Sequence, residues 1–236
     1  MDYRELAQEA VAAAQRLGAH AAEAYILDAK SLLVEVVDQQ VETLKFAGDT
    51  GIGVRVLAGD RRAGFAFSTG IDPAAVEGVV RQAVANSRRA FADPCNILPG
   101  PPPAELPALC LFDPAVAAAP VEAKIELAKE TERAARRTDR RVRRTERCVY
   151  EDAEYGVTLA SSCAFAVAYR AGYCGLAGIV LAEEEGDVQT GMGMAYGRDF
   201  ASLDPQAVGR EAAEDACRLL GAKTIGTAKA SLVLHQ

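Results

Sequence analysis

The chain contains no tryptophan and only two histidines in 236 residues, and aromatic residues make up 6% of it. His20 and His235 stand near opposite ends, and neither belongs to an H-x-x-x-H or H-E-x-x-H motif. A catalytic zinc site takes about three protein ligands held on rigid elements. The scarcity of aromatic rings also disfavours a stacking platform for single-stranded nucleic acid. The sequence therefore predicts no complete metal site and no catalytic site in this chain.

Targeting and membrane-spanning segments are also lacking. The first residues carry Asp2, Glu5 and Glu9 where a signal peptide needs a basic region followed by an apolar run. No uncharged apolar stretch approaches the roughly 20 residues that span a bilayer. The net charge is −7, which repels phosphate backbones and disfavours binding to nucleic acid. We expect a cytoplasmic protein without a membrane partner.

The six cysteines include no C-x-x-C pair, so we expect reduced and mostly buried thiols. Cys163 lies in the sequence Ser161-Ser162-Cys163, in which Ser162 or Cys163 is a candidate nucleophile. No histidine is near it in sequence, and a polar turn followed by a buried cysteine is the favoured interpretation.

Two further motifs have a functional and a structural interpretation. The glycines of GIGVRV at 51–56 neither open a helix nor precede Lys-Ser/Thr, so close strand packing or a bulge is favoured over phosphate binding. The acidic segment 183–187 lacks the alternating ligands of an EF-hand, which favours a solvated β-turn over a cation site.

Hydrophobic residues make up 50% and charged residues 25% of the chain, which is typical of a globular protein. Asp72-Pro73 and Asp204-Pro205 are helix starts, because Asp caps the helix and Pro suits its first position. Apolar periodicity predicts helices at 3–17, 72–92, 120–139 and 205–220. Alternation predicts strands at 21–28, 31–37, 40–46, 51–57, 62–68, 141–151, 155–161, 164–172, 175–183, 187–196 and 229–234.

The predicted fold class is α+β, with antiparallel or mixed sheets and flanking helices. Most of the ten prolines fall in one segment, which we interpret as an extended linker without regular structure. The predicted organisation is an amino-terminal α+β part at 1–92, a Pro-rich linker at 93–119 and a second α+β part at 120–236.

The charge distribution has one local exception. Residues 133–147 contain eight arginines and two acids. Arg136, Arg137, Arg140 and Arg144 form a candidate interaction patch for an acidic partner or nucleic acid. The alternative is an Arg-rich solvated helix end, where cations oppose the negative end of the helix dipole; we favour this alternative.

Many short motifs, in order along the chain, resemble the TldD/PmbA family, whose members are described as modulators of DNA gyrase and as peptide-maturation proteases. The amino-terminal domain is matched by the run 22–69, which ends in GFAFST. The PmbA (TldE) branch is matched by helix 72–92 with Asp93-Pro94-Cys95, and by Tyr155-Gly156-Val157, Gly172-Tyr173-Cys174, Ala182-Glu183-Glu184 and Gly186-Asp187.

This resemblance implies a non-zinc subunit that forms a heterodimer with a zinc-bearing TldD-like subunit and acts on unfolded or precursor peptides. Zinc is expected only on that partner, because none of the family's metal ligands can be carried onto this sequence. The resemblance also implies that the chain is truncated before the family's carboxy-terminal domain.

Three functions are therefore considered. The first is the amino-terminal part of a PmbA-like metallopeptidase subunit, which lines a substrate chamber and acts in proteolysis with a partner chain or as a homo-oligomer. The second is a regulatory module that acts on DNA gyrase or another partner through the Arg-rich segment. The third is a free-standing hydrolase that uses Ser162 or Cys163.

Overall fold

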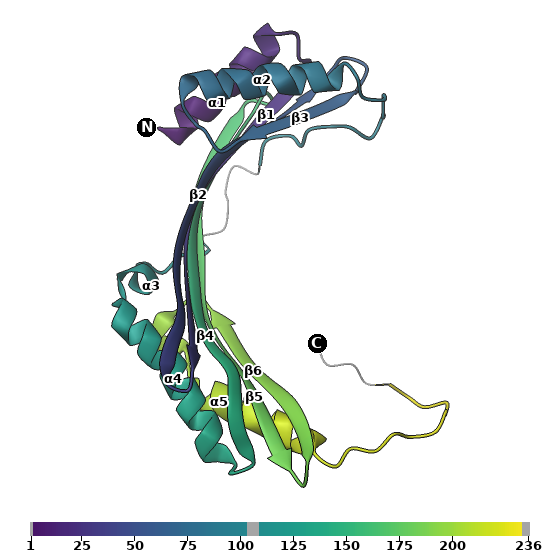
Figure 1. Cartoon of the computed structure of the whole chain (residues 1–236). Helices are drawn as coiled ribbons and strands as arrows, with labels where there is room; N and C mark the ends of the chain where they lie inside the picture. The colour runs from purple at the N-terminus through teal and green to yellow at the C-terminus, as the bar shows by residue number, and fades with distance from the viewer. Residues whose placement is uncertain (1, 103–108, 233–236) are drawn as a thin grey trace.

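A computed structural model of the chain describes residues 2–102 and 109–232. Its strands form one antiparallel sheet in the order β3-β2-β1-β4-β5-β6. The sheet is long and bends into an arc, with helices on the outer side of the arc (Figure 1). The predicted α+β class is confirmed. The strands are β1 (Ala21–Val37), β2 (Gln40–Leu57), β3 (Ala63–Ser68), β4 (Val142–Ser161), β5 (Phe165–Glu184) and β6 (Asp187–Gly197).

The long helices begin where the sequence predicts. The side chains of Asp2, Asp72 and Asp204 each accept hydrogen bonds from backbone N–H groups in the first helical turn, so these orphan donors are satisfied. Helix α2 ends at Ser87 rather than at residue 92. The helices are α1 (Tyr3–Arg16), α2 (Pro73–Ser87), α3 (Pro114–Ala118), α4 (Val121–Thr138) and α5 (Pro205–Leu219). Among the described residues, no helix is both long and apolar enough to cross a membrane.

Four pairs of predicted strands are in fact four continuous strands, β1, β2, β4 and β5. The prediction was wrong at polar or glycine-containing stretches such as Asp28–Ser31, Gly48–Gly51 and Gly172. These stretches lie in the middle of the arc between the two groups of helices (Figure 1), so they break the apolar alternation without making a turn. The strand predicted at 229–234 is also wrong for 229–232, which have no regular structure; 233–236 lie outside the described residues.

Pairing between β1 and β4 joins the two predicted parts. Residues Glu23–Val36 pair antiparallel with Cys148–Ser161 without interruption, so strands from both sides of the Pro-rich segment belong to one sheet. The described part of that segment is irregular up to Asp113, but it ends in α3 (Pro114–Ala118). The prediction of irregular structure for 93–114 thus holds for 93–102 and 109–113, α3 follows directly, and 103–108 lie outside the described residues. The proposed part boundaries stay a prediction.

Alternation along β1 separates the two faces of the sheet. Its even-numbered apolar side chains are buried under helices: Ala22, Ala24 and Ile26 under the first group, and Leu32, Val34 and Val36 under the second. Successive strand residues point to opposite faces, so the odd-numbered side chains face the inner side of the arc. We call that inner side the concave face.

A buried carboxylate fixes α4 to the β1–β2 hairpin. The side chain of Glu132 is 0% exposed. Its oxygens accept hydrogen bonds from the backbone N–H groups of Asp38 (2.9 Å) and Gln39 (2.7 Å), and from Nη2 of Arg136 (3.0 Å). Asp38 and Gln39 have φ of 49° and 61°, as a two-residue hairpin turn of type I′ requires. The carboxylate thus accepts hydrogen bonds from both backbone N–H groups at the centre of this turn.

Replacing this carboxylate is expected to destabilise the fold. In Glu132→Gln, one oxygen that accepts hydrogen bonds becomes an amide group that can only donate them. The buried N–H donors that it faces are then left unpaired, which should lower the free energy of unfolding by about 3 kcal/mol. Urea unfolding followed by circular dichroism measures the loss. The matched control is Glu126→Gln, whose exposed carboxylate pairs with Arg133 at the surface and should change stability by less than about 0.5 kcal/mol. Equal midpoints for the two variants would contradict the role given to Glu132.

Candidate functional site

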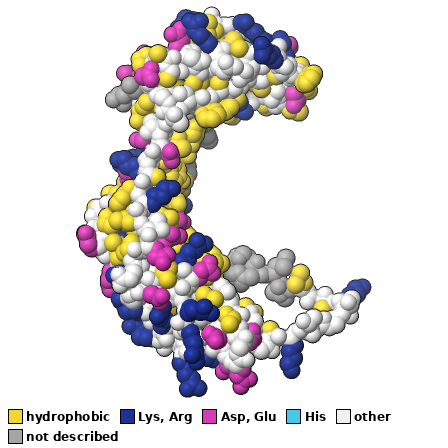
Figure 2. All heavy atoms as spheres, in the orientation of Figure 1, with side chains coloured by type: hydrophobic (Ala, Val, Ile, Leu, Met, Phe, Trp, Pro, Cys, Tyr) yellow, Lys and Arg dark blue, Asp and Glu magenta, His cyan; other side chains and the backbone are white. Residues whose placement is uncertain are grey.

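None of the described helices packs against the concave face, which carries large exposed apolar side chains. Figure 2 shows hydrophobic side chains along the inner side of the arc. Exposed apolar residues that gather on one face mark interaction sites more often than scattered ones do. The set comprises Tyr25, Phe65, Phe67, Tyr169, Tyr173, Met192, Met194 and Tyr196.

In the upper part of this face, aromatic rings lie over a glycine. Gly53 is the direct cross-strand partner of Tyr25 on β1 and of Phe67 on β3. A Cβ atom on Gly53 would lie 3.2 Å from the ring of Phe65, so the missing side chain makes room for that ring. The rings of Phe65 and Phe67 lie 6.3 Å apart, and Phe67 is 73% exposed. This arrangement confirms that the GIGVRV glycines serve close packing.

The lower part repeats the arrangement on β5 and β6. A Cβ atom on Gly175 would lie 2.3 Å from the ring of Tyr196, and the rings of Tyr173 and Tyr196 lie 6.3 Å apart. Partial burial, together with the nearby carboxylate of Glu151, raises the pKa of Tyr196 to about 12, so its hydroxyl is a neutral donor at pH 7. Met192 adds a flexible, polarisable side chain that adapts to varied partners.

Sequence reasoning did not find this surface. Its signal is alternation of aromatic or methionine residues with small ones, as in AGFAFS at 63–68 and GMGMAYG at 191–197. Such alternation predicts a strand with two different faces, but it does not reveal that both strands turn their larger side chains to the same uncovered face.

The four arginines of the candidate patch fall into two groups. Arg136 pairs with Asp38 and with the buried Glu132, and Arg137 pairs with Glu130. Hydrogen bonds from Arg133 and then from Arg137 lower the pKa of Glu130 to about 2. These two patch arginines therefore support the fold.

The other two, Arg140 and Arg144, are exposed and have no ion-pair partner in the described ranges 2–102 and 109–232. Arg143 shares both properties. Figure 2 shows Lys and Arg side chains gathered at this lower end of the molecule. Whether the patch binds anything stays a prediction.

The candidate nucleophiles lie in the β4–β5 turn. The hydroxyl oxygen of Ser162 accepts a hydrogen bond from the backbone N–H of Ala22 (3.0 Å), and that of Ser161 accepts one from the N–H of Cys163 (3.1 Å). Ala164 has φ of 63°, as the turn requires. The Ser162 hydroxyl thus holds the turn against β1 and the Ser161 hydroxyl bonds within the turn, in agreement with the polar-turn interpretation.

The acidic segment 183–187 is a β-turn that joins β5 to β6. Oδ2 of Asp187 accepts a hydrogen bond from the backbone N–H of Gly221 (2.7 Å), and Glu184 pairs with Arg141 at 3.1 Å. Across residues 2–102 and 109–232, no three His, Cys, Asp or Glu side chains are grouped as metal ligands. The described residues therefore do not fit a zinc centre.

The thiols differ in burial more than the sequence predicts. Cys148 and Cys174 are buried, Cys163 and Cys217 are half-buried, and Cys95 and Cys110 are exposed. The expectation of mostly buried thiols is therefore wrong. The exposed pair lies in the Pro-rich segment, where few apolar neighbours are available to cover it. Burial raises the pKa of Cys148 to about 12 and that of Cys174 to about 11.

Alkylation should separate these classes. With iodoacetamide at pH 8, Cys95 and Cys110 should react within minutes, whereas Cys148 and Cys174 should react only after unfolding, because the thiolate is the reactive form. Peptide mass spectrometry over time measures each site, and labelling in urea is the control. Rapid, selective labelling of Cys163 would contradict the polar-turn interpretation and support the hydrolase hypothesis.

Comparison with known proteins agrees with these features. Residues 22–87 match a family model described as PmbA/TldA metallopeptidase domain 1, and residues 114–220 match one described as the PmbA/TldA metallopeptidase central domain. The chain is 31% identical over 243 aligned positions to the metalloprotease PmbA of Escherichia coli O157:H7. That alignment covers 98% of this chain and 52% of the relative, so the chain spans about half of the relative's length.

Solved structures share the fold. A proposed modulator of DNA gyrase from Bacteroides thetaiotaomicron superposes with a TM-score of 0.86 at 21% identity, over 95% of this chain and 52% of the other. A second proposed modulator, from Thermotoga maritima, gives 0.80 at 18% identity, over 96% and 50%. TldE from Thermococcus kodakarensis gives 0.78 at 13% identity, over 90% and 47%. With both family models matched in order, the chain belongs to the PmbA/TldD metallopeptidase family.

Proposed function

We propose that this chain is the amino-terminal part of a PmbA-like, non-zinc subunit that forms a cytoplasmic heterodimer with a zinc-bearing TldD-like subunit. Its role is to hold extended, unfolded or precursor peptides while the partner supplies the zinc and cleaves them. The concave face is the observation that carries this proposal.

Three properties of the concave face suit an extended peptide. Rings such as Phe67 and Tyr196 are more than half exposed, so a peptide gains apolar contact without displacing a packed helix. Tyrosine and methionine accept many side-chain shapes, which suits binding of varied sequences. The face follows one continuous sheet, so its contacts repeat along the peptide's length. The described residues do not fit a zinc centre, which is why the proposal assigns the metal to the partner.

Removal of two rings should weaken peptide binding. Phe67→Ala with Tyr196→Ala, introduced into the heterodimer, is expected to raise the Kd of a fluorescent unfolded peptide at least fivefold, because an aromatic anchor contributes about 1 kcal/mol or more. Fluorescence anisotropy measures the Kd, and peptide cleavage is followed in parallel. Phe91→Ala is the matched control, because Phe91 is 94% exposed and lies in the loop after α2 rather than on a strand of the sheet.

Zinc content and assembly test the remainder of the proposal. Light scattering should show a one-to-one heterodimer after co-expression, and elemental analysis should find zinc only when the TldD-like subunit is present. A homo-oligomer of this chain that binds stoichiometric zinc would contradict the assignment. Unchanged peptide affinity in the double variant would contradict the role of the concave face.

The exposed arginines favour a second candidate, a regulatory module for an acidic partner such as DNA or a gyrase subunit. Two of the structural relatives are described as proposed modulators of DNA gyrase. Arg140 and Arg144 are exposed and without an ion-pair partner in the described part of the chain, so their charge is available to a partner.

A matched pair of variants tests this candidate. If the patch binds duplex DNA at ~0.15 M salt, Arg140→Ala with Arg144→Ala should reduce the affinity severalfold and make binding less salt-dependent. Arg88→Ala with Arg89→Ala is the control, since both are exposed at the end of α2. Arg136 is unsuitable because its loss would leave Glu132 buried without its cation. Undetectable binding, or equal effects of both pairs, would exclude this candidate.

A further inference from the structure

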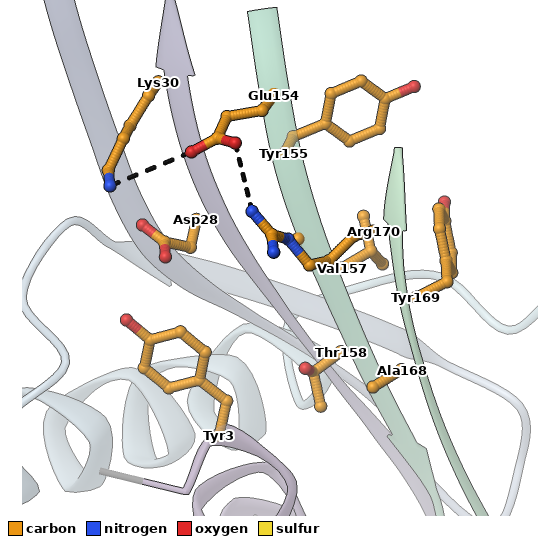
Figure 3. Close-up of a pocket in the computed structure, with 11 residues that line it drawn as sticks. Tyr3, Asp28, Lys30, Glu154, Tyr155, Val157, Thr158, Ala168, Tyr169 and Arg170 are labelled. Atoms are coloured by element: carbon orange, nitrogen blue, oxygen red, sulfur yellow. Dashed lines mark hydrogen bonds and ion pairs between the residues drawn. The ribbon is translucent and has the colours of Figure 1, made fainter. Parts of the chain in front are cut away.

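A pocket of about 550 Å³ lies on the helix-bearing face of the sheet, beside the start of α1. We call it the waist pocket. Its lining comes from the start of α1 and from the middle of β1, β4 and β5 (Figure 3). The lining side chains that matter here are Tyr3, Asp28, Lys30, Glu154 and Arg170. The pocket lies on the opposite face of the sheet from the aromatic concave surface.

A glycine opens the floor of this pocket. Asp28 on β1, Gly156 on β4 and Arg170 on β5 stand in one cross-strand row. Adjacent strands lie about 4.8 Å apart, so the two charged residues are anchored about 10 Å from each other. Gly156 stands between them without a side chain, and the nearest atom to a Cβ built there is a backbone oxygen at 3.9 Å. The space between the charges is therefore unfilled.

Two cations of the pocket, Arg170 on β5 and Lys30 on β1, share one carboxylate on β4. Oε2 of Glu154 lies 3.0 Å from Nη2 of Arg170, and Oε1 lies 3.9 Å from Nζ of Lys30. One carboxylate thus faces two cations. The guanidinium of Arg170 also lies 4.2 Å from the ring centre of Phe112, which restricts its orientation. The remaining guanidinium donors are available to a carboxylate.

Asp28 lies on β1, across Gly156 from Arg170. Oδ1 of Asp28 accepts a hydrogen bond from the hydroxyl of Thr50 at 3.1 Å. Within residues 2–102 and 109–232, no cation lies at ion-pair distance from this carboxylate. Figure 3 shows the ring of Tyr3 on the same side, with its hydroxyl toward Asp28. The row therefore has a carboxylate on β1 and a guanidinium on β5, and the four formal charges of the pocket sum to zero.

We propose that the waist pocket binds a small zwitterion with a free ammonium and a free carboxylate, that is, an amino acid or a dipeptide. The ammonium lies against Asp28 at the β1 side of the pocket, and the carboxylate lies against Arg170 at the β5 side. A simple anion would meet two carboxylates and a simple cation would meet two positive side chains, whereas a zwitterion matches both sides. The volume suits a ligand of this size. This site is separate from peptide binding on the concave face, so either proposal can fail alone.

Calorimetric titration of the purified chain with L-alanyl-L-alanine tests the proposal. Saturable binding is expected, with at least tenfold weaker binding of the same dipeptide when it is acetylated at the amino end and amidated at the carboxyl end. Asp28→Asn and Arg170→Gln should each weaken binding about tenfold. Gly156→Val should abolish it, because the side chain fills the space while all charges remain.

Arg81→Gln is the control, since this exposed arginine pairs with Glu77 on α2, away from the pocket, and should bind the dipeptide as the unaltered chain does. Circular dichroism spectra of all variants should be equal. Absence of saturable binding at millimolar dipeptide, equal binding of the blocked dipeptide, or equal affinity of Asp28→Asn, Arg170→Gln and Arg81→Gln would overturn the proposal.

Discussion

The rest of the molecule depends on the antiparallel pairing of β1 with β4. Fourteen consecutive register pairs join Glu23–Val36 to Cys148–Ser161, and each of these strands also carries a neighbour on its other edge. The hairpin partners of β1 and β4 therefore extend the sheet in both directions. Both groups of helices attach to the same long strands, so neither group has a sheet of its own. The covalent linker adds only a second connection between regions that the sheet already joins.

This pairing also explains why one face of the sheet is uncovered. The described helices pack on the face of the sheet to which the even-numbered side chains of β1 point, and their buried side chains form three separate clusters. On the opposite side, which no helix of the described residues covers, the strands' own side chains reduce contact with water. Phe65 lies over Gly53 and Tyr196 over Gly175, so rings partly cover the glycine-containing strands. Some apolar surface stays exposed, and that surface is what the proposed peptide binding uses.

Local chemistry predicted much of the fold. Helix starts at Asp72 and Asp204 were correct because capping depends on residues within one turn, and the antiparallel strands followed from alternation. The continuity of the strands was not predictable, because Asp28 and Lys30 interrupt the apolar pattern where the sheet faces solvent. Pairing of β1 with β4 joins residues more than a hundred positions apart, which local patterns do not encode. The arginine cluster was located from sequence. Which of its arginines stabilise the fold and which are free to bind a partner became clear only from the position of Glu132 in the structure.

The two faces of the sheet offer different chemistry because their side chains alternate. On the concave face, Phe65 lies over Gly53 and Tyr196 over Gly175, and exposed rings and methionines offer apolar contact. On the other face, the same strands place Asp28, Glu154 and Arg170 in the gap between the helix groups. An apolar surface suits the variable interior of an extended peptide, whereas paired charges of both signs suit chain ends. If both proposals hold, one sheet binds long peptides on its concave face and amino acids or dipeptides in the waist pocket on its other face. The polar residues that interrupt the apolar alternation of the strands in the sequence are the same residues that line the waist pocket.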